Sequence, residues 1–160
     1  MSWNSAFLRQ ARCDHEIFKL LRKANAPYHQ QLHYLQMILE KLSKSVWADA
    51  LYRTGMPWKH WAIDNALVYI TKDPAYQRLL KMKNLKTRIN RLSAFAKKIE
   101  VLAPANAKGG CNVEYPWLTG NAVIAPIDHE NDFWQSFFDP RSTDMTSLVD
   151  LLDRLLRIIK

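Results

Sequence analysis

The sequence predicts an all-α protein: an antiparallel bundle of four to five helices with a small β-hairpin appendage before the C-terminal helix. Three observations lead to this prediction. Apolar residues recur at helical intervals up to about residue 102, short β-prone runs follow, and a last helical pattern closes the chain. At 160 residues, the chain is long enough to bury roughly 70 % of its unfolded surface in one core. We therefore expect residues 1–160 to form a single domain.

The composition points to a soluble, intracellular protein. Hydrophobic residues make up 48 % of the chain, and only four glycines and seven prolines are present, which leaves little room for disordered linkers. The two cysteines form no recognisable disulfide or metal-binding pattern, so a reducing cytoplasmic setting is expected. The N-terminus does not resemble a signal peptide, and no run of about 18 apolar residues could span a membrane.

The first two helices follow from leucine-rich periodic patterns. Residues 5–24 are expected to form the first helix, with Asn4 or Ser5 as its N-cap. After the interruption at Asn25-Ala26-Pro27, a second helix is predicted over residues 28–53. Its apolar positions repeat at intervals of three and four residues: Leu32, Leu35, Leu39, Leu42 and Val46.

Two further helices are expected in the middle of the chain. Gly55 and Pro57 mark the end of the second helix, and the next one is predicted over about residues 58–71. Asp73-Pro74 then starts a long fourth helix, predicted over about residues 75–102.

The period changes after Pro104. A hairpin is predicted over about residues 111–126, centred on the turn Thr119-Gly120-Asn121. Glu114, Tyr115 and Trp117 could line a pocket beneath this hairpin or clamp it to the helices. A final amphipathic helix is expected over about residues 143–160.

Charge is unevenly distributed. The predicted helix 75–102 carries eight basic residues and one acidic residue, whereas residues 128–153 carry seven acidic residues and only Arg141. A basic helical face attracts phosphate backbones through counterion release. The candidate nucleic-acid-binding residues are Lys83, Lys86, Arg91, Lys97 and Lys98. The alternative is a face that is only solvated, or one that is neutralised by the acidic segment of this chain or of a dimer mate.

A row of polar residues interrupts the apolar pattern of helix 28–53. This polar row consists of His29, His33, Gln36, Glu40 and Lys44, at successive steps of four, three, four and four residues. Because apolar residues flank it on two sides, we expect it to be partly buried and its charges to be paired. Two interpretations remain open: a structural ion pair with satisfied histidines, or an inner polar cleft that binds a ligand. No third metal ligand lies nearby on this helix and no phosphate-binding loop is present, so neither a metal nor a cofactor is expected.

Two stretches resemble a known family. LHYLQMILEKLSKS, with His60 downstream, and IEVLAPANAKGGCNVEYPW resemble HEPN-domain proteins of an uncharacterised bacterial branch. The resemblance implies a helical bundle, frequent homodimerisation, and a link to RNA cleavage, toxin–antitoxin pairs or phage defence.

Catalytic HEPN proteins use an Arg followed by a His after a short spacer. Arg53 and His60 fit this pattern, as do Arg22 with His29 and Arg9 with His15. The residue after each arginine is not the short polar residue of the family pattern, and helix 75–102 contains no histidine. We therefore expect a non-catalytic accessory or adaptor module that binds RNA, another nucleic acid or a protein partner. The alternative is a metal-independent ribonuclease that uses Arg53 and His60.

Overall fold

The computed structural model describes residues 2–53, 63–129 and 131–159. It confirms the predicted fold class, because helices dominate and the described strands form one small antiparallel hairpin before the last helix. None of the helices in the described residues is long and apolar enough to cross a bilayer. The elements are α1 (Trp3–Lys23), α2 (Tyr28–Arg53), α3 (Ile63–Lys72), α4 (Pro74–Leu80), α5 (Leu85–Glu100), α6 (Pro104–Ala107), β1 (Trp117–Thr119), β2 (Ala122–Ile124), α7 (Asn131–Ser136) and α8 (Asp144–Ile158).

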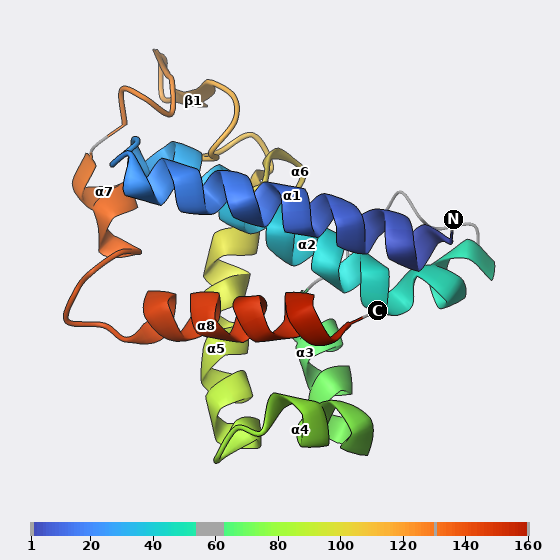
Figure 1. The fold of residues 1–160 in the computed structure, drawn as a ribbon. Coiled ribbons are helices and arrows are strands. Elements are labelled where there is room, and N and C mark those ends of the chain that lie inside the picture. Colours follow the sequence, from blue (N-terminus) through green and yellow to red (C-terminus); the bar gives the residue numbers. More distant parts are fainter. Residues whose placement is uncertain (1, 54–62, 130, 160) are drawn as a thin grey trace.

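Helices α1 and α2 form a long antiparallel pair (Figure 1). The N-cap of α1 is Ser2, whose side chain accepts a hydrogen bond from the Ser5 amide, so the predicted caps Asn4 and Ser5 lie inside the helix. Asn25, at φ 50°, sits in the turn between the two helices, where an Asn tolerates the left-handed region. Helix α2 runs unbroken from Tyr28 to Arg53, with the bounds that the sequence predicted.

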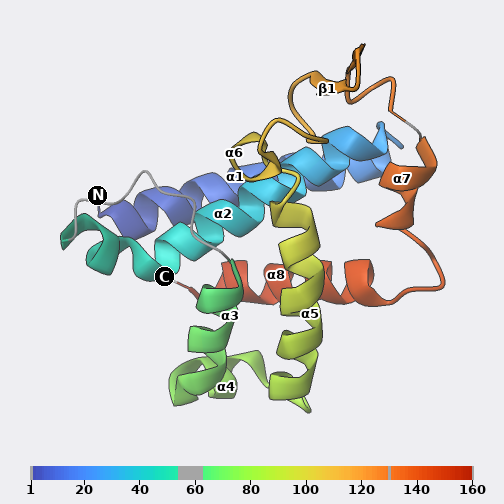
Figure 2. The same cartoon turned by 180° about the vertical axis from the view of Figure 1, so that it is seen from behind.

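The predicted single helix 75–102 is wrong, because the chain folds into two helices there. Helix α4 ends at Leu80 and α5 begins at Leu85, with Lys81 and Asn84 at positive φ between them. This break turns the chain so that α5 runs back antiparallel to α3 (Figure 2). Buried side chains on both sides of the break, Leu80 and Ile89, can then reach the core.

For the predicted helix 58–71, the described part is α3, and residues 54–62 lie outside the described residues.

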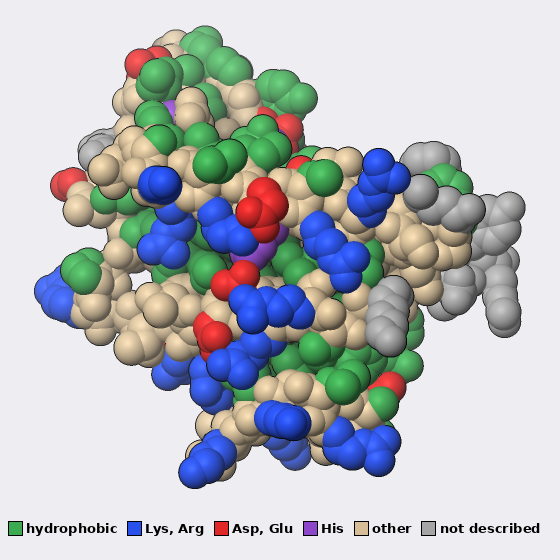
Figure 3. Space-filling model, in the orientation of Figure 1, with side chains coloured by type: hydrophobic (Ala, Val, Ile, Leu, Met, Phe, Trp, Pro, Cys, Tyr) green, Lys and Arg blue, Asp and Glu red, His purple; other side chains and the backbone are tan. Residues whose placement is uncertain are grey.

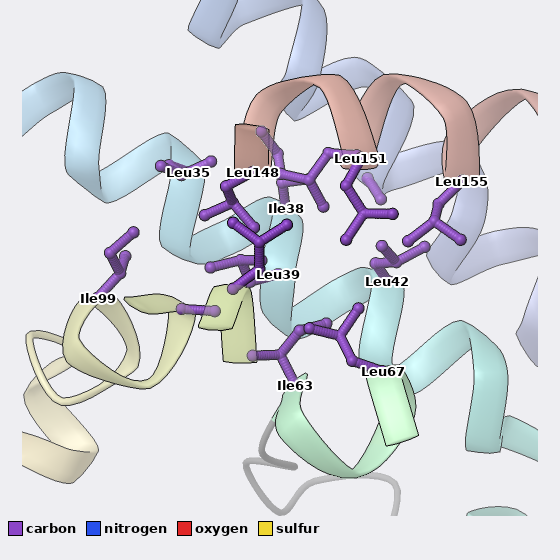
Figure 4. Close-up of a cluster of buried hydrophobic side chains, with 14 of the residues drawn as sticks. Leu35, Ile38, Leu39, Leu42, Ile63, Leu67, Ile99, Leu148, Leu151 and Leu155 are labelled. Carbon is purple, nitrogen blue, oxygen red and sulfur yellow. The ribbon is translucent and has the colours of Figure 1, made fainter. Parts of the chain in front are cut away.

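The α3/α5 pair crosses the α1/α2 pair steeply, and α8 lies beside both pairs (Figures 1 and 2). The core fills the space where they meet, and Figure 4 shows side chains from α2, α3, α5 and α8 pointing toward one another there. Burying each such side chain contributes roughly 1.5 to 3 kcal/mol relative to leaving it exposed. The fully buried members include Leu35, Ile38, Leu39, Leu42, Ile63, Leu67, Ile99, Leu148, Leu151 and Leu155.

Polar side chains join helix ends across this core. The Arg12 guanidinium on α1 donates to the carbonyls of Leu156 and Ile159, at 2.8 and 2.9 Å, and so satisfies acceptors at the C-terminus of α8. The buried carboxylate of Glu100, the last residue of α5, accepts a hydrogen bond from the Ile63 amide at the start of α3. A carboxylate is favourable there because helix N-termini carry partial positive charge. These contacts fix how α8 and α3 are placed against the rest.

The hairpin lies within the predicted range. Strands β1 and β2 pair Trp117 with Ile124 and Thr119 with Ala122, and Gly120 adopts φ 61° in the two-residue turn between them. Trp117 is buried, as expected of a residue that clamps the hairpin to the helices. Helices α6 and α7, on either side of the hairpin, were not predicted from the sequence.

The core analysis generates a stability prediction. Leu39→Ala should lower the free energy of unfolding by about 2 to 5 kcal/mol, because Leu39 has no exposed surface and its truncation leaves a cavity. Leu118→Ala is the matched control: Leu118 is 66 % exposed on the hairpin, so the change should stay within about 0.5 kcal/mol. Urea denaturation followed by circular dichroism measures both. Equal effects of the two substitutions would contradict the proposed core.

Candidate functional site

A pocket of about 740 Å³ lies between the C-terminal half of α1, the start of α2 and the segments that flank the hairpin. Its volume falls within the usual range for small-molecule sites. The pocket is open on one side, and its walls are mostly apolar. The lining residues with polar side chains are His29, Gln30, His33, Tyr34 and Glu114. The apolar lining residues are Ile17, Leu21, Val113, Pro116, Ala125, Pro126 and Ile127.

Glu114 and His33 lie next to each other on the pocket wall. The Nδ1 atom of His33 lies 3.4 Å from Oε1 of Glu114. This Nδ1 is buried, and it has no hydrogen-bond partner among the described residues. The contact is therefore a close approach of two titratable groups rather than a completed hydrogen bond, and it becomes an ion pair only when His33 carries a proton.

A short turn before Glu114 fixes the backbone of this residue. The buried Asn112 side chain accepts hydrogen bonds from the Glu114 and Tyr115 amides, at 3.0 and 2.8 Å. The Val113 amide donates to the Leu102 carbonyl and so fastens the turn to the end of α5. Of the three residues that the sequence placed beneath the hairpin, Glu114 lines the pocket, Trp117 is buried and Tyr115 is 61 % exposed.

His29 occupies the apolar part of the pocket wall. Burial lowers the pKa of His29 below its usual 6.5, because an imidazolium loses hydration there. Its ring lies 6.4 Å from that of Trp134, whose indole N–H donates to the Pro126 carbonyl. His29 therefore enters the pocket wall as a neutral ring at pH 7.

The rest of the polar row lies further along α2 and does not line this pocket. The Gln36 amide approaches Glu40 at 3.4 Å, and the Lys44 ammonium contacts Glu40 at 2.6 Å. The Lys44 ammonium also lies 5.7 Å from the centre of the Phe7 ring on α1. The predicted row thus divides into two pocket histidines and a paired polar group packed against α1.

The candidate nucleic-acid residues also divide into two groups. Arg91 pairs with Asp144 at 2.9 Å and contacts Thr143 and Ser147. The lysines at 83, 86, 97 and 98, which we call the basic surface, are all exposed. Figure 3 shows further Lys and Arg side chains gathered over α4 and the loop before α5. The acidic segment therefore pairs with the arginine that faces α8, whereas the four lysines lie on exposed positions.

The three Arg and His pairs have different positions. Helix α2 ends at Arg53, and both His60 and the segment that joins it to Arg53 lie outside the described residues. His15 is buried where α1 meets α8, with Nε2 3.5 Å from Asp153, whereas Arg9 is exposed. Arg22 lies over the Phe18 ring, at 5.8 Å from its centre.

Other chemistry finds little support in the described residues. No group of three or more His, Cys, Asp and Glu side chains there could hold a metal ion. Burial raises the pKa of the Cys111 thiol, which leaves less of the reactive thiolate at pH 7.

Comparisons with protein-family models, curated proteins and solved structures found no match to this chain. Function must therefore be inferred from the chemistry of the pocket and of the basic surface.

His15 generates a prediction about pH and stability. Desolvation lowers its pKa below 6.5 and outweighs the opposing attraction of Asp153. As pH falls below about 6.5, the unfolded chain takes up this proton before the folded one does, so the free energy of unfolding decreases. His15→Gln should therefore lose less stability than the wild type between about pH 7.5 and 5.5, the range in which histidines titrate. Urea denaturation at both pH values measures this, and an equal or larger loss in the variant would refute it.

Proposed function

We propose that this chain is a HEPN-like, non-catalytic adaptor module that binds nucleic acid through its basic surface. One observation carries the proposal: Lys83, Lys86 and Lys98 are exposed and have no acidic partner among the described residues. In contrast, the neighbouring arginines at 88 and 91 are paired with acids of α8. The family resemblance supports a role beside a toxin, antitoxin or defence effector, and a homodimer as the working form.

Unpaired surface lysines favour a polyanion over a single anion. Each lysine that meets a phosphate releases a condensed counterion, and this release supplies affinity without base specificity. Lys86 and Lys98 project from the solvent side of α5, whose opposite side carries the buried Ile89, Leu92, Ala96 and Ile99. The part of the basic surface that lies on α5 is thus held by a packed helix and needs little reorganisation when it binds.

The positions of His15 and His29 favour binding over catalysis. General acid and base chemistry on RNA requires an imidazole within hydrogen-bond reach of the reacting hydroxyl. His15 is buried between two helices, and His29 lines an apolar pocket whose lining includes none of the lysines of the basic surface. The ribonuclease alternative depends on Arg53 and His60, and it becomes an outcome of the experiment below.

The binding test compares two double variants with the same change in charge. Lys86→Gln/Lys98→Gln should weaken binding to a labelled single-stranded RNA by about tenfold at about 0.1 M salt. It should also lower the salt slope by about 1.4, because each single-strand phosphate contact contributes about 0.7. Lys19→Gln/Arg154→Gln is the control, since both residues are paired with neighbouring acids, and it should change little. Fluorescence anisotropy across a salt series measures both.

Equal weakening by the two double variants would show that net charge alone attracts the RNA and would refute the basic surface. Wild-type protein that fails to bind even at low salt would remove the nucleic-acid function. RNA recovered from the same samples is run on a denaturing gel. Cleavage by the wild type that disappears in His60→Ala would replace the adaptor with the ribonuclease.

A further inference from the structure

We propose that the pocket between α1, α2 and the hairpin binds a small organic amine: an apolar, preferably aromatic body that carries a protonated primary amino group. The ammonium would sit on the Glu114 carboxylate, and the apolar body would lie against the walls. This site is separate from the basic surface and goes beyond the proposed binding of nucleic acid.

The charge of the pocket selects a cation. The whole chain has a formal net charge of +8, yet the described residues that line this pocket include no Lys or Arg. Among these described residues Glu114 is the only carboxylate, and His29, His33 and Tyr34 are the other titratable side chains. A carboxylate on an apolar wall attracts a cation more strongly than it would in water, because the local dielectric constant is lower.

The hydrogen-bonding groups on the wall are incomplete. The Glu114 side chain is 24 % exposed and makes no hydrogen bond to the described residues. The neighbouring His33 Nδ1 is buried without such a bond either. A primary ammonium has three N–H donors and can donate to the partly exposed Glu114 carboxylate, which has acceptor capacity left over. A carboxylate ligand would instead bring a second negative charge against Glu114.

The remaining walls suit a ring. The His33 and Tyr34 rings meet edge to face at 5.2 Å between centroids, and His29 adds a third ring from the same helix. Ile17, Pro126 and Ile127 supply the apolar surface opposite. Because burial lowers its pKa, His29 is neutral at pH 7 and does not repel an ammonium.

The test uses two probes of similar size and opposite charge, 2-phenylethylamine and 3-phenylpropionate, at about pH 7.5. We expect the wild type to bind the amine at least about tenfold more tightly, since a hydrogen bond to a charged group contributes about 1.5 kcal/mol or more. Titrations followed by amide chemical shifts give both dissociation constants. They also locate the binding, which should shift the amides of His33, Val113 and Glu114.

Glu114→Gln removes the charge and keeps the shape, so its preference for the amine should fall to about twofold or less. Glu16→Gln is the matched control, because Glu16 is an exposed glutamate of α1, paired with Lys19, that does not line this pocket. It should keep the wild-type preference. The comparison of the two probes on the wild type needs no variant and therefore stands even if Glu114→Gln unfolds.

Three results would overturn the proposal. The first is equal or tighter binding of the propionate by the wild type. The second is an unchanged preference in folded Glu114→Gln. The third is amide shifts confined to residues outside the pocket. None of these bears on RNA binding, which is measured with different variants, so a failure of the pocket and a failure of the basic surface are distinguishable.

Discussion

Helix α2 must be covered on more than one side, and the packing of the other helices follows from this constraint. Leu35, Ile38, Leu39 and Leu42 occupy successive turns and are all without exposed surface. One partner helix cannot cover so broad an apolar surface, because a helix that packs against a single neighbour buries only one stripe. Helix α1 therefore lies along one side of α2, while α3, α5 and α8 close the other (Figure 4).

Polar residues at the edge of this packing have to be paired, since an isolated charge removed from water costs several kcal/mol. Lys41 meets the buried Asp14 of α1 at 3.2 Å, and Lys44 meets Glu40 at 2.6 Å. Near the start of α2, loop segments and the residues that flank the hairpin pack against this helix beside the pocket. The pocket lies where these segments meet α2, beside His29 and His33. The same polar row is thus structural along most of its length and open to a ligand at one end.

The sequence predicted those helices whose periodic pattern and end signals are both local, and it missed a break that has no such signal. Helix α2 was predicted with its observed bounds because its period is strong and Pro27 fixes its start. The break between α4 and α5 was missed because residues 81–84 contain neither Gly nor Pro. Asn84 is of a type that tolerates the left-handed region, but one such residue is a weak signal, and a lysine such as Lys81 gives no sign of its positive φ.

In the candidate site, the sequence predicted the residues but not which of them come together. The spacing on α2 placed His29 and His33 on one row, and the composition of residues 114–117 suggested a pocket beneath the hairpin. Their meeting could not be predicted, because it depends on the bond between Val113 and Leu102 that carries the turn onto α2. Likewise, the sequence showed both the basic and the acidic segments. It did not show that Arg91 would form an ion pair with Asp144, or that the lysines would lie on exposed positions.

The distribution of charge separates two kinds of ligand. Asp144 and Asp150 of α8 pair with the arginines of α5, whereas Lys86 and Lys98 on its solvent side have no acidic partner among the described residues. Glu114 lies in a pocket whose described lining holds no lysine or arginine, and its carboxylate repels phosphate. The described lining of this pocket includes none of the lysines of the basic surface, so a polyanion on the lysines and a cation in the pocket would be held by different residues.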